Sequence, residues 1–241
     1  MPTHDAYRNE YHEKMRSYTA EYREKMLSKS NRMAILHKLS LLDAERETFF
    51  DTLTDIASHL LEVPVSLVSL VAANYQFFKS STGLPEPWNS ERRTPLSHSF
   101  CQHVVVTGEP LIVEDAREVN FLKDNLAIPD LDVISYLGMP LTTDDGERLG
   151  SFCVIGPKPH KWTADEIKIV EAFSRVVNAE IDARATAYHQ RELESYIATY
   201  SSKYLEGLKA KLLTASTTTD VVRHLDAITA DIGKAAGKLR N

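Results

Sequence analysis

The chain has 241 residues, of which 43% are hydrophobic and 26% are charged, and its formal net charge is −6. This balance is ordinary for a globular protein, and the net acidity argues against a nucleic-acid surface, which is usually basic. No apolar run approaches the roughly 20 residues of a membrane helix, and the polar N-terminus does not resemble a secretory signal. The two cysteines, Cys101 and Cys153, give neither a disulfide framework nor a zinc-ligand spacing. We expect a cytoplasmic protein with reduced thiols, no metal, and no nucleic-acid or membrane partner.

Residues 1–31 carry an amphipathic pattern. Tyr and Met recur at spacings of three and four residues between Ala6 and Leu27, which predicts one helix with a seam close to a heptad repeat. The seam consists of Tyr7, Tyr11, Met15, Tyr18, Tyr22 and Met26. A single helix cannot bury this seam alone, so we expect it to pack on the domain, on the C-terminal helix or on a second subunit.

The next part of the chain predicts helices followed by a hairpin. Apolar residues within 32–42 and again within 49–61 have helical spacing. Pro64 ends the second helix, and the run 65–71 (VSLVSLV) predicts a buried strand. A close turn then leads to a second strand at 76–80, so the two strands should form an antiparallel hairpin.

A long polar loop is expected over 82–95, with Trp88 inside it. The following stretch, LSHSFCQHVVVTGEPLIVEDA (96–116), predicts a short helix, a turn, a buried strand and a capped loop. Its carboxylate Asp115 can cap the turn that follows or contact a ligand. Its Ser, His and Cys side chains make this stretch the first candidate for the wall of a small-molecule pocket.

The remaining residues predict a loop, a hairpin and a long helix. A helical turn is expected near 121–125, and strands at 135–142 and 148–155 flank an Asp-Gly turn. Thr163 and Glu166 form a capping box, and apolar spacing continues to Leu208 without Pro. After a break at 216–219, a last amphipathic helix is expected over 221–239, weakened by its two glycines.

These elements, in this order, resemble a GAF domain of the bacterial sensory type found in sensor histidine kinases and diguanylate-cyclase regulators. The resemblance covers about residues 32–184. It rests on LLDAERETFFDTLTDIASHLLEVPVSLVSLV (41–71), QFFKSSTGLP (76–85), LSHSFCQHVV (96–105), PLIVEDA (110–116), YLGMPL (136–141) and RLGSFCVIGPKP (148–159).

The resemblance implies an α+β fold with a central antiparallel sheet of five or six strands. Helices are expected on one face of the sheet and a ligand cavity on the other, with long helices at both ends. The chain is accordingly expected to divide into an N-terminal helix (1–31), the GAF domain (32–184) and a C-terminal helical extension (185–241). The C-terminal extension is expected to be helical, without an output domain.

The same resemblance places a set of residues at the cavity. They are Phe78, Ser99, Phe100, Cys101, His103, Asp115, Phe121, Tyr136 and Cys153. Both cysteines are equally compatible with simple core packing, because free cysteine behaves as a small hydrophobe. His98 and His103 are five residues apart and do not share a helix face, so they are not expected to form a metal pair.

GAF domains bind different ligands, and the cofactor stays unknown. The cyclic-nucleotide signature is matched loosely by Asn120, Phe121, Asp124 and Asn125, but it lacks the lysine and the final Asp-Glu pair. Bilin-binding members carry Cys directly before His, whereas Gln102 separates Cys101 from His103 here. Free methionine sulfoxide reductases of this family use reactive thiols, which the two cysteines could in principle supply. Nucleophile elbows, P-loops and dinucleotide motifs do not occur.

We therefore expect a non-enzymatic sensory or regulatory protein that binds a small molecule and acts on a downstream signalling protein. Family members pair their terminal helices, so a homodimer with a coiled-coil character is expected. The expected contacts are Tyr7, Tyr11, Met15, Tyr18, Tyr22, Ile181, Tyr188, Ile197 and Tyr200. The alternatives are a structural dimerisation module without a ligand and a thiol-based redox enzyme of the methionine sulfoxide reductase type.

Overall fold

The computed structural model describes residue 11, residues 13–15 and residues 17–214, mainly as backbone beyond residue 199. Contacts divide the chain into two units, Met1–Ala185 and Thr186–Asn241. None of the described helices is both long and apolar enough to cross a membrane.

A six-stranded antiparallel sheet forms the centre of the first unit, in the order β3-β2-β1-β6-β5-β4. The strands are β1 (Val65–Val71), β2 (Tyr75–Thr82), β3 (Arg93–Pro95), β4 (Leu111–Val113), β5 (Ser135–Thr142) and β6 (Arg148–Gly156). Both predicted hairpins, β1–β2 and β5–β6, are confirmed. The second turns at Gly146, whose φ of 80° suits a residue without a side chain. The α+β fold with an antiparallel sheet is thereby confirmed.

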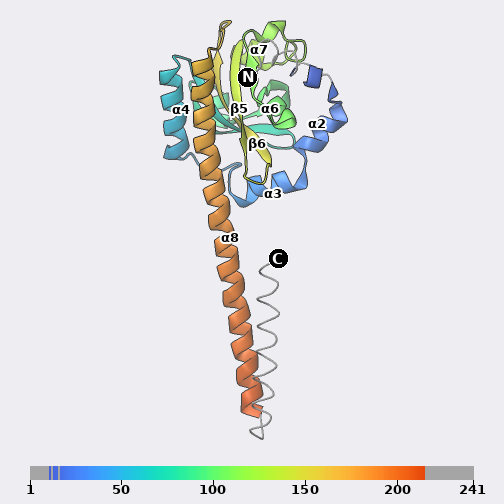
Figure 1. Cartoon of the computed structure of the whole chain (residues 1–241), viewed down its shortest axis with the longest axis vertical. Coiled ribbons are helices and arrows are strands. Elements are labelled where there is room, and N and C mark those ends of the chain that lie inside the picture. Colours follow the sequence, from blue (N-terminus) through green and yellow to red (C-terminus); the bar gives the residue numbers. More distant parts are fainter. Residues whose placement is uncertain (1–10, 12, 16, 215–241) are drawn as a thin grey trace. The chain divides into compact units, whose positions relative to one another are not determined.

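Helices cover both faces of this sheet (Figure 1). On one face lie α4 (Thr48–Leu60) and the first part of α8 (Ala164–Thr214), where Phe173 stacks on Phe152 of β6 at 5.3 Å between ring centroids. On the other face lies α6 (Cys101–Thr107), which the N-terminal segment covers in turn. Two layers of helix therefore enclose the sheet, and the expected cavity lies on the α6 side.

The N-terminal seam is not one helix, contrary to the prediction. Described residues between 11 and 17 are helical, the chain is extended at Thr19, and α2 (Ala20–Leu27) begins anew. The reason is local, because the Thr19 hydroxyl accepts a hydrogen bond from the backbone N–H of Tyr22 at 3.1 Å and caps the second helix. A further helix, α3 (Ser30–Lys38), leads into the domain. The predicted contact Tyr7 lies outside the described residues.

One loop prediction is wrong, and another misses a short helix. The expected loop 82–95 contains α5 (Trp88–Glu91) and the edge strand β3, which pairs with the start of β2. Three residues are too few to show a strand period, so only the pairing partner defines β3. The helical turn expected near 121–125 is present, with the backbone N–H of Lys123 donating to the Val119 carbonyl at 2.9 Å. The helix α7 (Ala127–Leu131) follows where only loop was expected, and the Asn125 side chain accepts from the backbone N–H of Ala127 at 2.9 Å at its start.

The C-terminal helix begins as predicted. Thr163 Oγ1 accepts from the backbone N–H of Glu166 at 3.2 Å, and Glu166 accepts from the backbone N–H of Thr163 at 2.7 Å, which completes the capping box. Helix α8 continues from Ala164 through Gly207 to Thr214. The expected break at 216–219 and the expected helix at 221–239 lie outside the described residues.

Candidate functional site

A small cavity lies between the sheet and the short elements around α6. Its volume is about 20 Å³, enough for little more than a water molecule and far below the ~300–1,000 Å³ of drug-sized sites. Four of the nine residues predicted for the cavity line it, namely Phe78, Phe100, Cys101 and Tyr136. The other lining residues are Val65, Leu67, Gln76, Leu84, His98, Ala127, Leu131, Val133 and Ile155. The lining is apolar with a few polar groups.

One wall of the cavity is held together by His98. Its Nε2 is 2.9 Å from Asp130 Oδ2 on α7, and its Nδ1 is 3.0 Å from Ser97 Oγ. The Trp88 ring from α5 packs on the imidazole, with 5.2 Å between ring centroids. Three short segments, separated in sequence, thus close the cavity through one histidine. Sequence reasoning did not assign His98 to the cavity, because only the folded chain brings α5 and α7 to it.

Two thiols meet behind the cavity. The sulfur of Cys101, the first residue of α6, is 3.9 Å from the sulfur of Cys153 in β6. The Tyr136 hydroxyl donates to Cys101 Sγ at 3.4 Å and is 3.0 Å from the Ser151 hydroxyl. Burial opposes ionisation of Cys101, but donors on Cys153, Ser151 and Tyr136 prevail and lower the pKa of this thiol. Burial raises the pKa of Cys153.

His103 lies on the opposite side of α6 from Cys101, as a two-residue helical spacing requires. It packs against Phe121 at 5.3 Å between ring centroids, and its Nδ1 has no hydrogen-bond partner among the residues that the structure describes. Burial, together with the nearby Arg23 guanidinium, lowers its pKa to about 3. Phe121 in turn contacts Tyr11, at 6.1 Å between centroids. Neither His103 nor Phe121 lines the cavity. Phe121 packs between His103 and Tyr11 of the N-terminal segment.

Ser99 and Asp115 have capping roles. Ser99 Oγ donates to the side chain of Gln76, which lines the cavity, and accepts from the backbone N–H of Gln102 at 3.0 Å. Asp115 accepts from the backbone N–H of Arg117 at 3.1 Å and starts a short helical turn, in agreement with the capping interpretation. Neither residue lines the cavity, and Ser99 acts on it through the lining residue Gln76.

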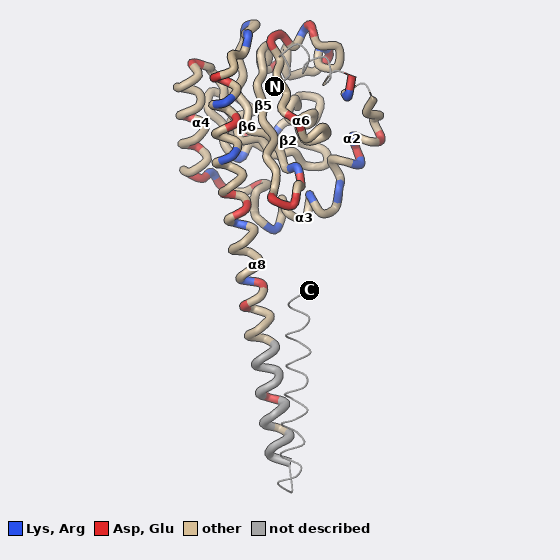
Figure 2. Tube along the Cα trace, viewed as in Figure 1, with Lys and Arg blue, Asp and Glu red and all other residues tan. Residues whose placement is uncertain are grey.

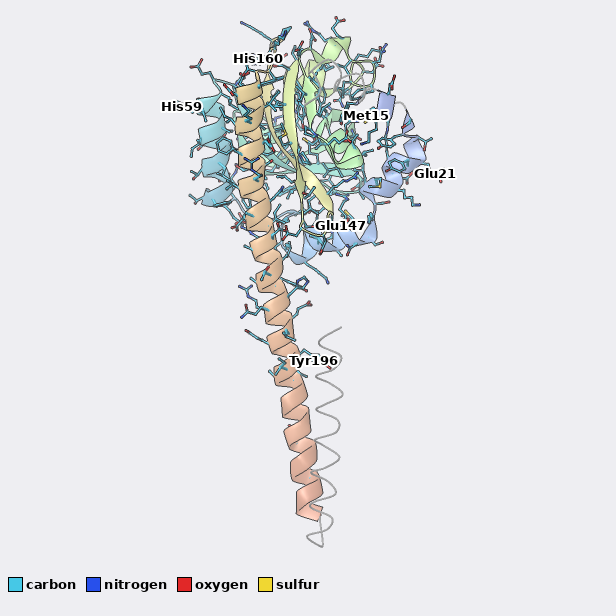
Figure 3. The ribbon with its side chains drawn as sticks, viewed as in Figure 1. Met15, Glu21, His59, Glu147, His160 and Tyr196 are labelled. Carbon is cyan, nitrogen blue, oxygen red and sulfur yellow. The ribbon has the colours of Figure 1, made fainter. Side chains whose placement is uncertain are left out.

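The residues expected at a dimer interface fall into two groups. Tyr11, Met15 and Ile181 are 3%, 0% and 1% exposed and pack within their own domain. Figure 3 shows Met15 on the α6 side of the sheet, where Lys14 forms an ion pair with Glu109. The partly exposed residues are Tyr18 and Tyr22, whose rings stack, Tyr188, which donates to Glu192, and Ile197. The side chain of Tyr200 is not described.

On the opposite face of the sheet, an ion cluster joins three elements. The fully buried Lys79 of β2 pairs with Glu47 at 2.5 Å, and Glu47 also binds Arg184 of α8. Both cations lie over the Phe50 ring of α4, at 5.7 and 5.0 Å from its centroid. The hydrogen bond from Arg184 is the main reason that the pKa of Glu47 falls to about 2. Sequence reasoning missed this cluster, because its members are up to 137 residues apart.

No group of three or more His, Cys, Asp or Glu side chains within the described residues could hold a metal ion. Acidic and basic residues are interspersed over the described elements, without a long stripe of one sign (Figure 2). The chemistry of the site is therefore that of a small, mostly apolar cavity with a thiol pair at its edge.

Among known proteins, a cyclic di-GMP phosphodiesterase of Pseudomonas aeruginosa is 31% identical to this chain over 161 residues. That match covers 66% of this chain but 27% of the relative, so the chain spans about a quarter of that protein's length.

Solved structures with a similar fold include the GAF domain of a phosphoenolpyruvate-protein phosphotransferase from Coxiella burnetii. It is 17% identical, covers 68% of this chain and 99% of its own, and has a TM-score of 0.48. The free methionine-R-sulfoxide reductase of Neisseria meningitidis is 15% identical, covers 66% and 90%, and has a TM-score of 0.46. Both scores are too low to bear on function. The family model of the GAF domain matches residues 45–181, more than half of the chain. The chain therefore belongs to the GAF domain family.

Proposed function

We propose that this GAF chain is a sensory or regulatory protein in which a change at the cavity is passed through the sheet to α8. The observation that carries the proposal is the arrangement of β2. Phe78 lines the cavity, while its neighbour Lys79 points to the other face and binds Glu47, which holds Arg184. Arg184 lies at the end of the first unit, just before Ala185. A displacement of β2 thus acts directly on the segment of α8 that leaves the domain.

The ligand of this cavity is proposed to be small and largely apolar, because apolar side chains dominate the lining. A ligand larger than a few atoms needs a wider cavity. The wall formed by His98, Asp130 and Trp88 can supply the space, since it consists of short segments outside the sheet. The side chains of Gln76, His98 and Tyr136 are available to orient polar groups of the ligand.

We propose a homodimer formed through α8. Leu193, Tyr196 and Ile197 are 43%, 47% and 47% exposed, which is unusual for large apolar side chains close together on one helix face. The sequence continues this spacing at Tyr200, Tyr204 and Leu208. If the α8 helices of two chains pack along these residues, the apolar spacing is that of a coiled coil. Tyr11, Met15 and Ile181 are excluded from the proposed interface, because they pack within the domain.

A regulatory role is proposed in preference to catalysis. The two thiols are fully enclosed, which disfavours turnover of a substrate as large as an amino acid. The relative from Pseudomonas aeruginosa is named for cyclic di-GMP hydrolysis, but most of its length is unmatched. We therefore propose an enzyme of cyclic di-GMP turnover in the cytoplasm as the first downstream partner to test.

The dimer is tested with charges placed on the seam. Leu193→Asp combined with Ile197→Asp should convert a dimer to a monomer in light scattering, because two carboxylates cannot be buried in a coiled-coil seam. Ser195→Asp combined with Ala198→Asp adds the same charge on the other face of α8 and should leave the dimer intact. Equal masses for both double variants would exclude this interface.

The ligand is tested by native mass spectrometry of the protein as purified, followed by thermal-shift measurements with candidate small molecules. A retained molecule, or a metabolite that raises the Tm and loses that effect in Phe100→Trp, supports the cavity. A dimer that no small molecule shifts would favour a purely structural module.

A further inference from the structure

The sulfur atoms of Cys101 and Cys153 are in direct non-bonded contact. They are 3.9 Å apart and must approach by about 1.9 Å to reach the bonded distance. Cys153 lies in a central strand, paired with Leu67 of β1 and Gly138 of β5, and is fixed. Cys101 begins a seven-residue helix that rests on the sheet and can shift more easily. The movement that closes the bond is therefore expected at Cys101 and the start of α6 rather than in the strand.

The surroundings of the pair are more polar than core packing needs. The Tyr136 hydroxyl lies within hydrogen-bonding distance of both Cys101 Sγ and Ser151 Oγ. The buried Ser69 hydroxyl is a further donor that lowers the pKa of Cys101. Hydroxyl donors stabilise a thiolate, which is the reactive form of cysteine. The two thiols differ because the Cys153 thiol donates to the Cys101 sulfur: this bond and the hydroxyls lower the pKa of Cys101, whereas burial and the same bond raise the pKa of Cys153.

The cavity gives Cys101 a route to small reagents. Cys101 lines it, whereas Cys153 does not. A volume of about 20 Å³ admits a molecule of a few atoms and excludes a tripeptide disulfide such as oxidised glutathione. The enclosure therefore selects the oxidant by size.

We propose that Cys101 and Cys153 form a reversible intramolecular disulfide when hydrogen peroxide reaches the cavity. The Cys101 thiolate attacks one peroxide oxygen, the O–O bond breaks, and the leaving hydroxide takes a proton to become water. Cys101 is thereby oxidised to a sulfenic acid. The Cys153 sulfur then attacks the Cys101 sulfur, the S–O bond breaks, and the leaving hydroxide takes the Cys153 proton as a second water. In total, two thiols are oxidised to a disulfide while one peroxide is reduced to two waters.

The disulfide also changes the cavity. Drawing Cys101 towards β6 moves the start of α6, where Phe100 and Cys101 form the wall, and removes the thiol that Tyr136 contacts. The redox state of the pair thus sets the shape of the site. This inference is independent of the proposed sensory function, because the chemistry needs neither a ligand nor a dimer.

The test uses the full chain, reduced and then treated with hydrogen peroxide under native conditions. Both thiols should disappear together, each chain should lose the mass of two hydrogen atoms, and peptide mapping should show Cys101 joined to Cys153. Dithiothreitol should restore both thiols. Oxidised glutathione should act far more slowly than peroxide on the folded protein, and this difference should vanish in denaturant. Thiols that survive peroxide, or a disulfide that links two chains, would overturn the proposal.

Two variants assign the roles. Cys153→Ser should stop at the first step, so that Cys101 is trapped by dimedone as a sulfenic acid. Cys101→Ser should give neither a disulfide nor a dimedone adduct under the same conditions. The reverse pattern would contradict the assigned order of attack. The result for the unmodified chain stands by itself if either variant folds poorly.

Discussion

The two faces of the sheet are built differently. The α6 face holds a cavity, a histidine whose burial keeps it neutral, and two thiols whose contacts with each other, Tyr136 and Ser151 involve uncharged groups. The α4–α8 face is fixed by charges, with Lys79, Glu47 and Arg184 gathered around the Phe50 ring. The ion pairs of the second face are anchored on the buried Lys79 and join β2 directly to α8. This difference supports the proposal that the first face senses and the second transmits.

The largest effect is expected from Glu47→Gln, which leaves the buried Lys79 without its counter-ion. We expect a loss of about 3 kcal/mol in the free energy of unfolding, the lower end of the range for breaking a buried pair. Urea denaturation measures it. Glu171→Gln, which removes an exposed i,i+4 pair with Arg175, is the matched control and should change stability by less than about 0.5 kcal/mol.

A double variant sharpens this prediction. Lys79→Met removes the buried charge, so the further change Glu47→Gln should be much less harmful in that background. Equal effects of Glu47→Gln in both backgrounds would show that the ion pair does not hold β2 to α8.

The next effect is a pH dependence carried by His103 on the other face. The pKa of His103 is about 3 in the folded chain, whereas an exposed histidine, as in the unfolded chain, has a pKa of 6.5. Between these values the unfolded chain binds a proton that the folded chain does not. The free energy of unfolding is therefore not reduced by His103 above pH 6.5, and it decreases as the pH drops from 6.5 towards 3. At pH 5 the loss is about 2 kcal/mol, from 1.36 kcal/mol per pKa unit.

His103→Leu should remove this part of the pH dependence, measured by urea unfolding between pH 7 and pH 4. The control is His59→Gln, because His59 is exposed on α4, away from the sheet (Figure 3). An unchanged slope in His103→Leu would mean that the histidine is already protonated in the fold.

The smallest effect is expected for Tyr136→Phe at the thiol pair. Loss of the hydroxyl removes hydrogen bonds to Cys101 and Ser151, which should lower stability by about 1 kcal/mol. The same variant should slow peroxide oxidation of Cys101. Tyr75→Phe, which removes a hydroxyl bonded to Asp43 at the surface, is the control and should leave the oxidation rate unchanged.

The sequence predicts the elements whose signals are local. The strands β1, β5 and β6 and the Thr163 capping box follow from apolar runs, turn residues and fixed spacings. The edge strand β3 does not, since its identity depends on pairing with β2. At Thr19 the prediction fails for a different reason. The Tyr and Met spacing predicts one continuous helix, but the Thr19 side chain caps a new helix and interrupts it.

The cavity is predictable only in part. The family resemblance points to Phe78, Phe100, Cys101 and Tyr136, which do line it. His98 enters the wall through Asp130 and Trp88, contacts that depend on the placement of two short helices. The Lys79–Glu47–Arg184 cluster likewise joins distant residues with no shared motif. Ion pairs between distant segments leave no periodic signal in a single sequence.

The central claim is that the state of the cavity reaches α8 through Glu47, and amide hydrogen exchange tests it most directly. Ala127→Leu fills the cavity from α7 and acts as a fixed occupant. We predict altered exchange protection in α8 around Arg184, and a much smaller change when Glu47→Gln is also present. Unchanged protection of α8 in a folded Ala127→Leu variant, or the same change with and without Glu47, would contradict the claim.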